Sequence, residues 1–206
     1  MKLLSLCFAI LCSCSVLGQK IVEKSLLDYE TEFIAINTEN CYQINIKTAA
    51  TSVLSVEAII DGEYQDDLLL KVKEESNAVY VSAGFNPGFN HPNDKLSAHK
   101  VVSISLEITI PEHKNVKVYG ASSNVVISGD YRDLGVSLLD GNCTLYNVGQ
   151  LSKIKTQSGN ITVFNTRAQI EASTKYGTIS RDSIPMGENQ FILSSTTGNI
   201  QLKKTK

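Results

Sequence analysis

The C-terminal half of this 206-residue chain repeats a short pattern at a fixed interval. Gly141, Gly159 and Gly177 are evenly spaced, Ser123 precedes Gly141 by the same interval, and Gly198 follows Gly177 by a slightly longer one. A fixed period of this length, about 18 residues, is typical of repeat architectures, in which each unit buries its apolar side against its neighbours. An amide or hydroxyl residue follows each of these positions: Asn124, Asn142, Asn160, Thr178 and Asn199.

Apolar and polar residues alternate on both sides of each corner, which predicts β-strands with one buried face. The position directly after the amide or hydroxyl residue is apolar in every unit: Val125, Cys143, Ile161, Ile179 and Ile200. A second column lies two residues later: Ile127, Leu145, Val163, Arg181 and Leu202. The charge of Arg181 predicts that the fourth unit is irregular at this point.

Two arrangements of the units are compatible with these corners. If the units stack in parallel about 4.8 Å apart, like residues lie above like, and the asparagines can form a side-chain ladder. If each Gly-Asn pair is a two-residue hairpin turn, the strands form an antiparallel meander. Stacking also explains why the apolar columns keep their register from one unit to the next. We therefore predict an all-β fold, a β-helix-like β-solenoid of about 18-residue repeats.

The corners themselves are predicted to be structural. Glycine bends the chain without a Cβ penalty, and asparagine tolerates a left-handed backbone while its side chain bonds nearby peptide groups. We assign this role to Gly141, Asn142, Gly159, Asn160, Gly177, Gly198 and Asn199.

The N-terminal half is rich in β-strand patterns but less regular. Strands are expected within 32–48, 52–60, 66–75, 77–84 and 101–111. The segment "ENCYQI" loosely echoes the repeat segment "GNCTLY", so this half consists either of degenerate coils of the same fold or of a separate cap. We predict two regions, an irregular one at 20–100 and the regular repeats at 101–206.

The first residues are typical of a targeting segment. Lys2 precedes an apolar run over 3–17, which is too short for a confident membrane span. We predict a signal peptide at 1–19 with cleavage near Gly18, and hence an exported protein in the periplasm, at the cell surface or in the medium. The alternative is a lipoprotein anchored at Cys14, because Leu-Cys-Ser-Cys resembles a lipoprotein box.

Charge and cysteine content narrow the function further. The chain has 19 basic and 21 acidic side chains, a net charge of −2. A weakly acidic, mixed surface lacks the electrostatic footprint of a nucleic-acid-binding protein.

Beyond the targeting segment only Cys41 and Cys143 remain. An exported protein can join such a pair in a disulfide, but Cys143 stands where other units have Ile or Val, so we expect two separate buried thiols.

Motifs for catalysis are missing. His91, His99 and His113 do not have the spacing of zinc ligands, and the sequence contains no nucleophile elbow, phosphate-binding loop or dinucleotide fingerprint. Acidic residues are scattered among the repeats instead of forming the carboxylate pair of a glycoside hydrolase. We therefore expect a non-enzymatic protein with no catalytic residue, no metal site and no cofactor.

One irregular loop, at 84–100, is the candidate for binding. Long loops in compact proteins often carry function. Phe85, Phe89 and His91 lie on it among Gly, Pro and Asn, so the two rings could stack on a sugar or a partner. The alternative is that both rings fold back and anchor the loop itself.

The units "SGNITV", "TTGNIQL" and "DGNCTL", together with a strand ending in "ITIPEHKNVKV", resemble a family of bacterial cell-envelope proteins. This is the putative-adhesin family of unknown function, whose Ser-Gly-Asn/Asp-apolar repeats are related to autotransporter adhesin head domains. The resemblance covers 100–206 well and the first half loosely. It implies a non-enzymatic adhesin or surface-interaction scaffold, and it supplies no ligand residues. The partner stays open, with a glycan or another envelope protein as the candidates.

Overall fold

The structure is a computed structural model that describes residues 19–27, 31–62, 68–86, 88 and 102–205. Every regular element in these residues is a β-strand, so the all-β prediction is confirmed. Residues 1–18 of the predicted signal peptide lie outside the described residues. The strands are β1 (Gln19–Leu26), β2 (Phe33–Asn37), β3 (Gln43–Ala49), β4 (Val53–Gly62), β5 (Leu68–Glu75), β6 (Ala78–Phe85), β7 (Val102–Pro111), β8 (Asn115–Gly120), β9 (Asn124–Leu138), β10 (Cys143–Thr156), β11 (Ile161–Asn165), β12 (Gln169–Thr174), β13 (Ile179–Arg181), β14 (Gln190–Ser195) and β15 (Ile200–Lys204).

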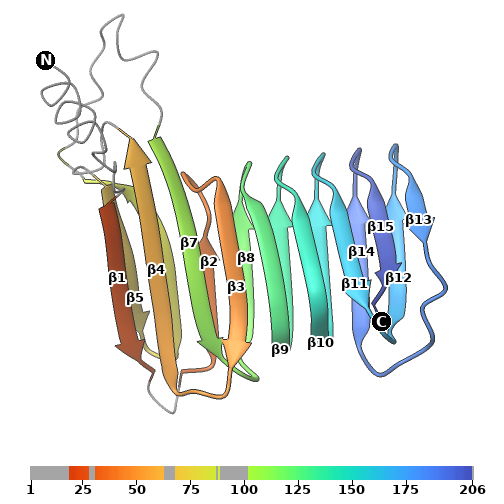
Figure 1. Ribbon diagram of the computed structural model, residues 1–206, viewed down its shortest axis with the longest axis horizontal. Helices are drawn as coiled ribbons and strands as arrows, with labels where there is room; N and C mark the ends of the chain where they lie inside the picture. The colour runs from red at the N-terminus through yellow and green to blue at the C-terminus, as the bar shows by residue number, and fades with distance from the viewer. Residues whose placement is uncertain (1–18, 28–30, 63–67, 87, 89–101, 206) are drawn as a thin grey trace, which may run out of the picture.

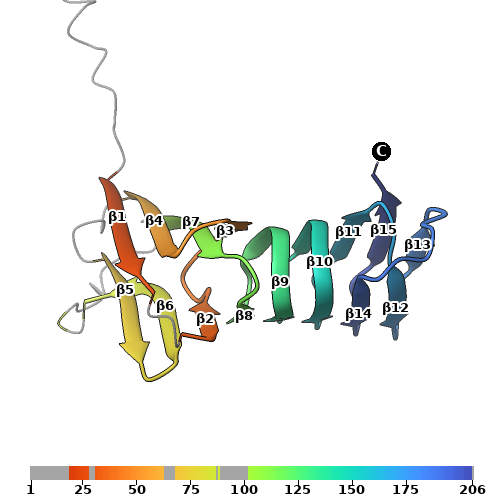
Figure 2. The same cartoon turned by 90° about the horizontal axis from the view of Figure 1, so that it is seen from below.

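The strands form two facing layers around a shared core (Figures 1 and 2). The first layer has the order β1-β4-β7-β3-β9-β10-β11-β15-β13. The second runs β5-β6-β2-β8, continues through the C-terminal parts of β9 and β10, and ends with β14 and β12. β9 passes between the layers at Gly129, which has a φ of +105°. β10 bends likewise between Tyr146 and Leu151, where its register with β9 shifts.

Neighbouring repeat units pair in parallel, at the offset seen in the sequence. In the first layer Cys143 pairs with Val125 of β9 and with Ile161 of β11, each exactly one repeat period away. The strands that flank a Gly-Asn corner therefore pair with other units and not with each other, as a hairpin would require. This pairing places the apolar columns one above another inside the molecule.

The last two units do not follow sequence order, contrary to the expectation that each unit stacks on the next. Ile200 of β15 pairs with Ile161 of β11 on one side and with Ile179 of β13 on the other. β14 likewise lies between β10 and β12. The fifth unit is thus inserted between the third and the fourth, and the chain returns through the segment 182–189 (Figure 1).

The size and polarity of the side chains in the apolar columns explain this order. The fourth unit has Ala172 and Arg181 where the fifth has Leu193 and Leu202, both buried. The fourth unit, which has fewer large apolar side chains, lies at the end of the stack, and the fifth unit lies inside it. Within the described residues, β12 pairs only with β14 and β13 only with β15, so both present an open edge. Arg181 occupies an inward register position on this edge, where a charge discourages pairing with another chain.

The N-terminal half continues the same core. β2 and β3 pair in parallel with β8 and β9, which sets Ile34 beside Val116 and Ile44 beside Val125. The echo between "ENCYQI" and "GNCTLY" is therefore out of register, because Ile44 and not Cys41 is level with Cys143. β4 to β7 cover the remaining expected strand segments and add antiparallel pairs. The division into 20–100 and 101–206 stays a prediction.

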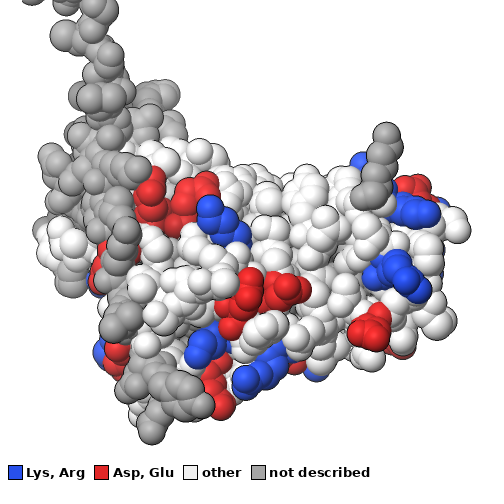
Figure 3. Space-filling view, turned by 60° about the horizontal axis from the view of Figure 1, so that its bottom comes forward, with Lys and Arg blue, Asp and Glu red and all other residues white. Residues whose placement is uncertain are grey.

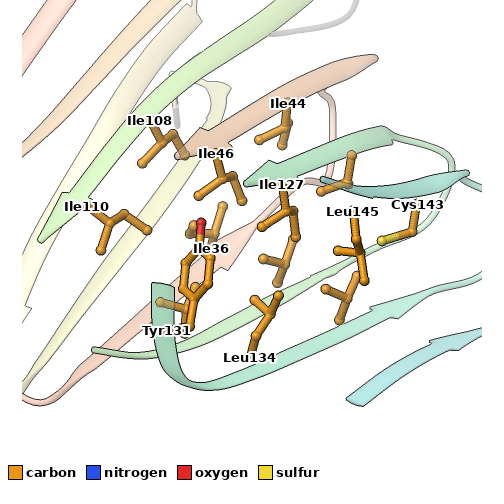
Figure 4. Packing of buried hydrophobic residues seen from close by; sticks show 14 of the residues in the cluster. Ile36, Ile44, Ile46, Ile108, Ile110, Ile127, Tyr131, Leu134, Cys143 and Leu145 are labelled. Carbon is orange, nitrogen blue, oxygen red and sulfur yellow. The ribbon is translucent and has the colours of Figure 1, made fainter. Parts of the chain in front are cut away.

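The core consists mainly of aliphatic columns, with Tyr131 and Phe191 as buried aromatic residues among those described; Figure 4 shows part of it. Tyr131 is fully buried at the bend of β9, and its hydroxyl donates a 2.9 Å hydrogen bond to the carbonyl of Ser128. Burial, with a smaller contribution from the Asp130 charge, raises the pKa of Tyr131.

Cys41 and Cys143 are buried and free, as predicted. Burial raises the pKa of each thiol to about 12.

The two thiols should react slowly in the folded protein. Because their pKa is about 12, almost no thiolate exists near neutral pH, and the reactive species forms only on unfolding. We expect an aromatic disulfide reagent at about pH 8 to label neither native cysteine and to label both in denaturant. An intact mass that rises by two hydrogens on reduction would instead show a disulfide.

The same shift predicts a loss of stability in alkali. The unfolded thiol releases its proton from about pH 9, whereas the folded thiol keeps it up to about 12. The free energy of unfolding should therefore fall as pH rises through this range. Cys143→Val, which matches Val125 and Ile161 in its column, should lose less stability than wild type between the two pH values. Equal losses in thermal melts would contradict the assignment.

The open edge gives a further prediction. Arg181→Val completes an apolar column at the edge of β13, so it should promote self-association. Light scattering should show a higher average molar mass than for wild type. Lys47→Val is the matched control, because β3 is paired on both sides, with β7 and β9. An equal rise in both variants would mean that added hydrophobicity, and not the edge, drives association.

Candidate binding surfaces

The glycine corners hold neighbouring units at close distance. A Cβ atom added to Gly159 would come nearer than 3.0 Å to the carbonyl oxygen of Gly141, and one on Gly198 would do the same to Gly159. Gly141 faces Ser123 in this way, and Gly177 faces Gly198. Neither these four glycines nor Asn142, Asn160 and Asn199 have a positive φ, so the corners do not use the left-handed backbone that asparagine tolerates. Glycine is required at these corners because peptide groups of adjacent units touch.

The corner asparagines form a continuous ladder on the outside. Asn142 donates its side-chain amide to the side-chain oxygen of Asn124 at 2.9 Å. The side-chain oxygen of Asn142 accepts the backbone N–H of Asn160 at 3.0 Å, and that of Asn160 accepts the N–H of Asn199 at 2.9 Å. Asn199 accepts the N–H of Thr178 at 2.9 Å. The ladder satisfies backbone donors and follows the same unit order as the strands.

The loop residues singled out in the sequence do not form a site in the described residues. Phe85 ends β6, pairs with Leu68 of β5 and packs, partly buried, against the core. This position fits the alternative that the ring anchors the loop. Phe89 and His91 lie outside the described residues.

The outer surface of the first layer carries an aromatic pair. We call this surface the amide face, because the corner asparagines stand where its strands β9, β10, β11 and β15 begin. Tyr146 of β10 and Phe164 of β11 are register partners, and their rings stack with centroids 4.7 Å apart and planes 11° apart. The ammonium of Lys203 lies 5.4 Å from the centre of the Phe164 ring. Tyr146 is 42% exposed, so the pair presents an aromatic surface to solvent.

The outer surface of the second layer is different, and we call it the lysine face. Lys117 of β8, Gly135 of β9 and Lys153 of β10 lie in one row across three strands. The next row contains Tyr119, Ser137 and Lys155. Gly135 leaves a shallow hollow of about 460 Å³ between the lysines. Its lining is Lys117, Val118, Tyr119, Gly135, Val136, Ser137, Lys153, Ile154, Lys155, Ile192 and Ser194.

A second hollow adjoins the first on the side of β2. It shares Lys117, Gly135 and Lys153 and adds Phe33 and Asp133 to its lining. Phe33 is 41% exposed, and Asp133 supplies a carboxylate. The lysine face thus combines cationic, apolar and acidic groups in a defined order.

Both surface features escaped the interpretation of the sequence, although the signal was present. Lys117, Gly135 and Lys153 are separated by the same interval as the corner glycines, and so are Tyr146 and Phe164. The same period also aligns the outward positions, because both faces of a strand share one register.

In the residues that the structure describes, no group of three His, Cys, Asp or Glu side chains is placed to hold a metal ion. Over the same residues, no helix is long and apolar enough to cross a membrane.

No family model and no curated protein matches this sequence. The fold is similar to that of a putative cell adhesion protein from Clostridium sporogenes, with a TM-score of 0.64, 16% identity, and coverage of 91% of this chain and 100% of that one. A putative adhesin from Bacteroides fragilis gives a TM-score of 0.36 at 12% identity, covering 91% and 97%. Because the second TM-score is low, only the first likeness bears on this chain, and at 16% identity it concerns the fold alone.

The close contact of the corners is testable by substitution. Gly159→Val should lower the free energy of unfolding by about 1–3 kcal/mol, because the added side chain forces two units apart. Gly135→Val is the control, since a Cβ there meets no atom nearer than 3.7 Å, and it should stay within about 0.5 kcal/mol of wild type. Denaturant melts that give equal midpoints for the two variants would refute the role of the corners.

Proposed function

We propose that this chain is an exported, non-enzymatic protein of the bacterial cell envelope, an adhesin or surface-interaction scaffold. The observation that carries the proposal is the pair of continuous sheet faces with exposed aromatic and charged side chains in register. Exposed aromatic rings beside charged side chains offer a surface on which a partner can pack. The likeness in fold to the putative cell adhesion protein of Clostridium sporogenes supports the same role.

The proposal includes a β-solenoid architecture whose coils repeat at the interval of the corner glycines. Parallel pairing at that offset, the glycine column and the asparagine ladder all support it. A stack of this kind is stiff along its length, because each coil is held to its neighbours by two sets of strand hydrogen bonds. Stiffness suits a protein that presents a surface to another body.

The proposal includes no catalytic site, cofactor or metal. Hydrolysis of a polysaccharide needs two carboxyl groups on either side of one bond, at most about 9.5 Å apart. On the lysine face of the repeats, Asp133 of β9 and Glu171 of β12 are three strands apart, roughly 14 Å at the usual strand spacing. A paired acid and base is therefore not supported on this face.

Export is tested in the native host. We expect a mature chain that begins at Gln19 or Lys20, found outside the cytoplasm and released in soluble form. Terminal sequencing and fractionation measure both. If the wild type stays with membranes and Cys14→Ser releases it, the lipoprotein alternative holds. A cytoplasmic full-length chain would refute the proposal.

Adhesion is tested with beads coated with the purified protein. They should attach to bacterial or host cell surfaces more than beads coated with an inert protein of similar charge. Deletion of the gene should weaken attachment of the native host to the same surfaces. Attachment equal to the inert control in both assays would exclude an adhesin.

A second function, glycan binding, is favoured by the Tyr146–Phe164 pair on the amide face. Exposed stacked rings offer the apolar surface and polarised edges that sugar rings pack against. Tyr146→Ser and Phe164→Ser should reduce binding to neutral glycans on an array. Tyr176→Ser is the matched control, because Tyr176 is 69% exposed but lies on the end unit, away from the pair. The loop 84–100 is the alternative glycan site.

A further inference from the structure

The hollow on the lysine face exists because one row lacks a side chain. Gly135 stands between Lys117 and Lys153 at the position that each of them fills in its own unit. The fold does not require glycine here. A Cβ atom would meet its nearest neighbour, the Cγ of Lys117, at 3.7 Å, and φ is not positive. Glycine at this position keeps a surface open, in contrast with the corner glycines, which let two backbones meet.

Cationic groups surround this opening. Lys117 and Lys153 are two strands apart, about 9.6 Å at the usual spacing, and Lys155 is two residues further, roughly 6.7 Å along β10. All three side chains are exposed. Within the described residues, none of them forms an ion pair with a carboxylate. Their charges are therefore available to an anion from solution.

Two carboxylates limit how an anion can lie. Asp133 is on the same strand as Gly135, at the side towards Phe33. Glu171 lies two strands beyond Lys153, across β14. The side with Tyr119, Ser137 and Lys155 carries no acidic residue in its row. Anionic groups of a ligand are thus directed to this side, away from Asp133.

The walls of the hollow are partly apolar. Tyr119 and Ile192 line it and are 44% and 43% exposed, and the lysine stems add methylene groups. A small ion would leave these apolar side chains exposed to water. A sugar ring that carries an acidic group would cover it and bring its charge to a lysine.

The wider surface argues against other polyanions. On the lysine face, the carboxylates of Asp133 and Glu171 flank the lysines, so the basic groups form no extended band. The side of the molecule shown in Figure 3, which is not the lysine face, likewise carries acidic and basic side chains in small groups. A nucleic acid places a phosphate at every step and needs such a band. A lipid bilayer is flat and does not reach a recess between side chains.

We propose that the lysine face binds an acidic polysaccharide, with a sugar ring over Gly135 and carboxylate or sulfate groups at Lys117, Lys153 and Lys155. The inference rests on the proposed surface role and names the class of its ligand. The site is separate from the aromatic pair on the amide face, which lies in the opposite layer.

The test measures binding of the purified protein to oligomers of polygalacturonate and of dextran sulfate by calorimetry, at low and at moderate salt. Neutral dextran is the uncharged control. Binding should weaken with salt, because exposed charges are screened. Lys117→Gln and Lys153→Gln should each weaken it about tenfold, the loss expected for one charge-assisted hydrogen bond. Gly135→Gln fills the hollow, keeps every lysine, and should weaken it as much.

The matched control is Lys47→Gln, which removes an exposed lysine from the amide face and should leave the affinity unchanged. Thermal melts verify that each variant is folded. Equal losses for Lys47→Gln and Lys153→Gln would overturn the site. Unchanged affinity in Gly135→Gln would overturn the role of the hollow. Tighter, lysine-dependent binding to a thymidine oligomer or to phosphatidylserine vesicles would overturn the ligand class.

The outcome is distinguishable from that of the proposed function. If neither acidic oligomer binds while coated beads still attach to cells, the further inference fails and the surface role stands. If the oligomers bind as expected but the chain remains in the cytoplasm, the surface role fails and the lysine site stands.

Discussion

The contact between peptide groups at the glycine corners is the constraint from which the rest of the structure follows. A Cβ atom at Gly159 or Gly198 has no room, because the carbonyl of the neighbouring unit occupies its place. The units can therefore approach to the spacing of hydrogen-bonded strands on both layers at once. When that spacing is set at the corner, every position in one unit acquires a fixed neighbour in the next, outside as well as inside.

This constraint does not determine which units are neighbours, and here the apolar columns decide. Gly198 lies against Gly159 on one side and against Gly177 on the other, so a glycine corner can adjoin either unit. The fifth unit brings Phe191, Leu193 and Leu202, all buried, whereas the fourth offers Ala172 and Arg181 at the positions of the last two. Inserting the fifth unit keeps the large side chains covered on both sides. The fourth unit then ends the stack, where a charge on the edge strand is an advantage.

These two effects explain what could be predicted from the sequence. Alternation and the period predict the strands, the parallel register and the burial of Cys143, because each depends on one unit and its spacing. The order of the last two units could not be predicted from the sequence. The chain that precedes Gly198 is long enough to place the fifth unit beside either the fourth, at Gly177, or the third, at Gly159. The echo at Cys41 misled because "ENC" matches in letters but not in register. The lysine row and the aromatic pair were predictable, since they have the same period as the core.

A surface built in this way suits recognition of a polymer. The strand spacing repeats about every 4.8 Å across the sheet, and the backbone under each side chain is held by the strands on both sides, so the backbone does not have to be ordered on binding. Evolution can then alter one outward residue without disturbing the fold, because the inward column and the corner carry the stability. Gly135 illustrates this freedom: its unit keeps Leu134 and Val136 buried in the core while the outward position between them is left empty. The stacked architecture thus separates the residues that hold the molecule together from those that can define what it binds.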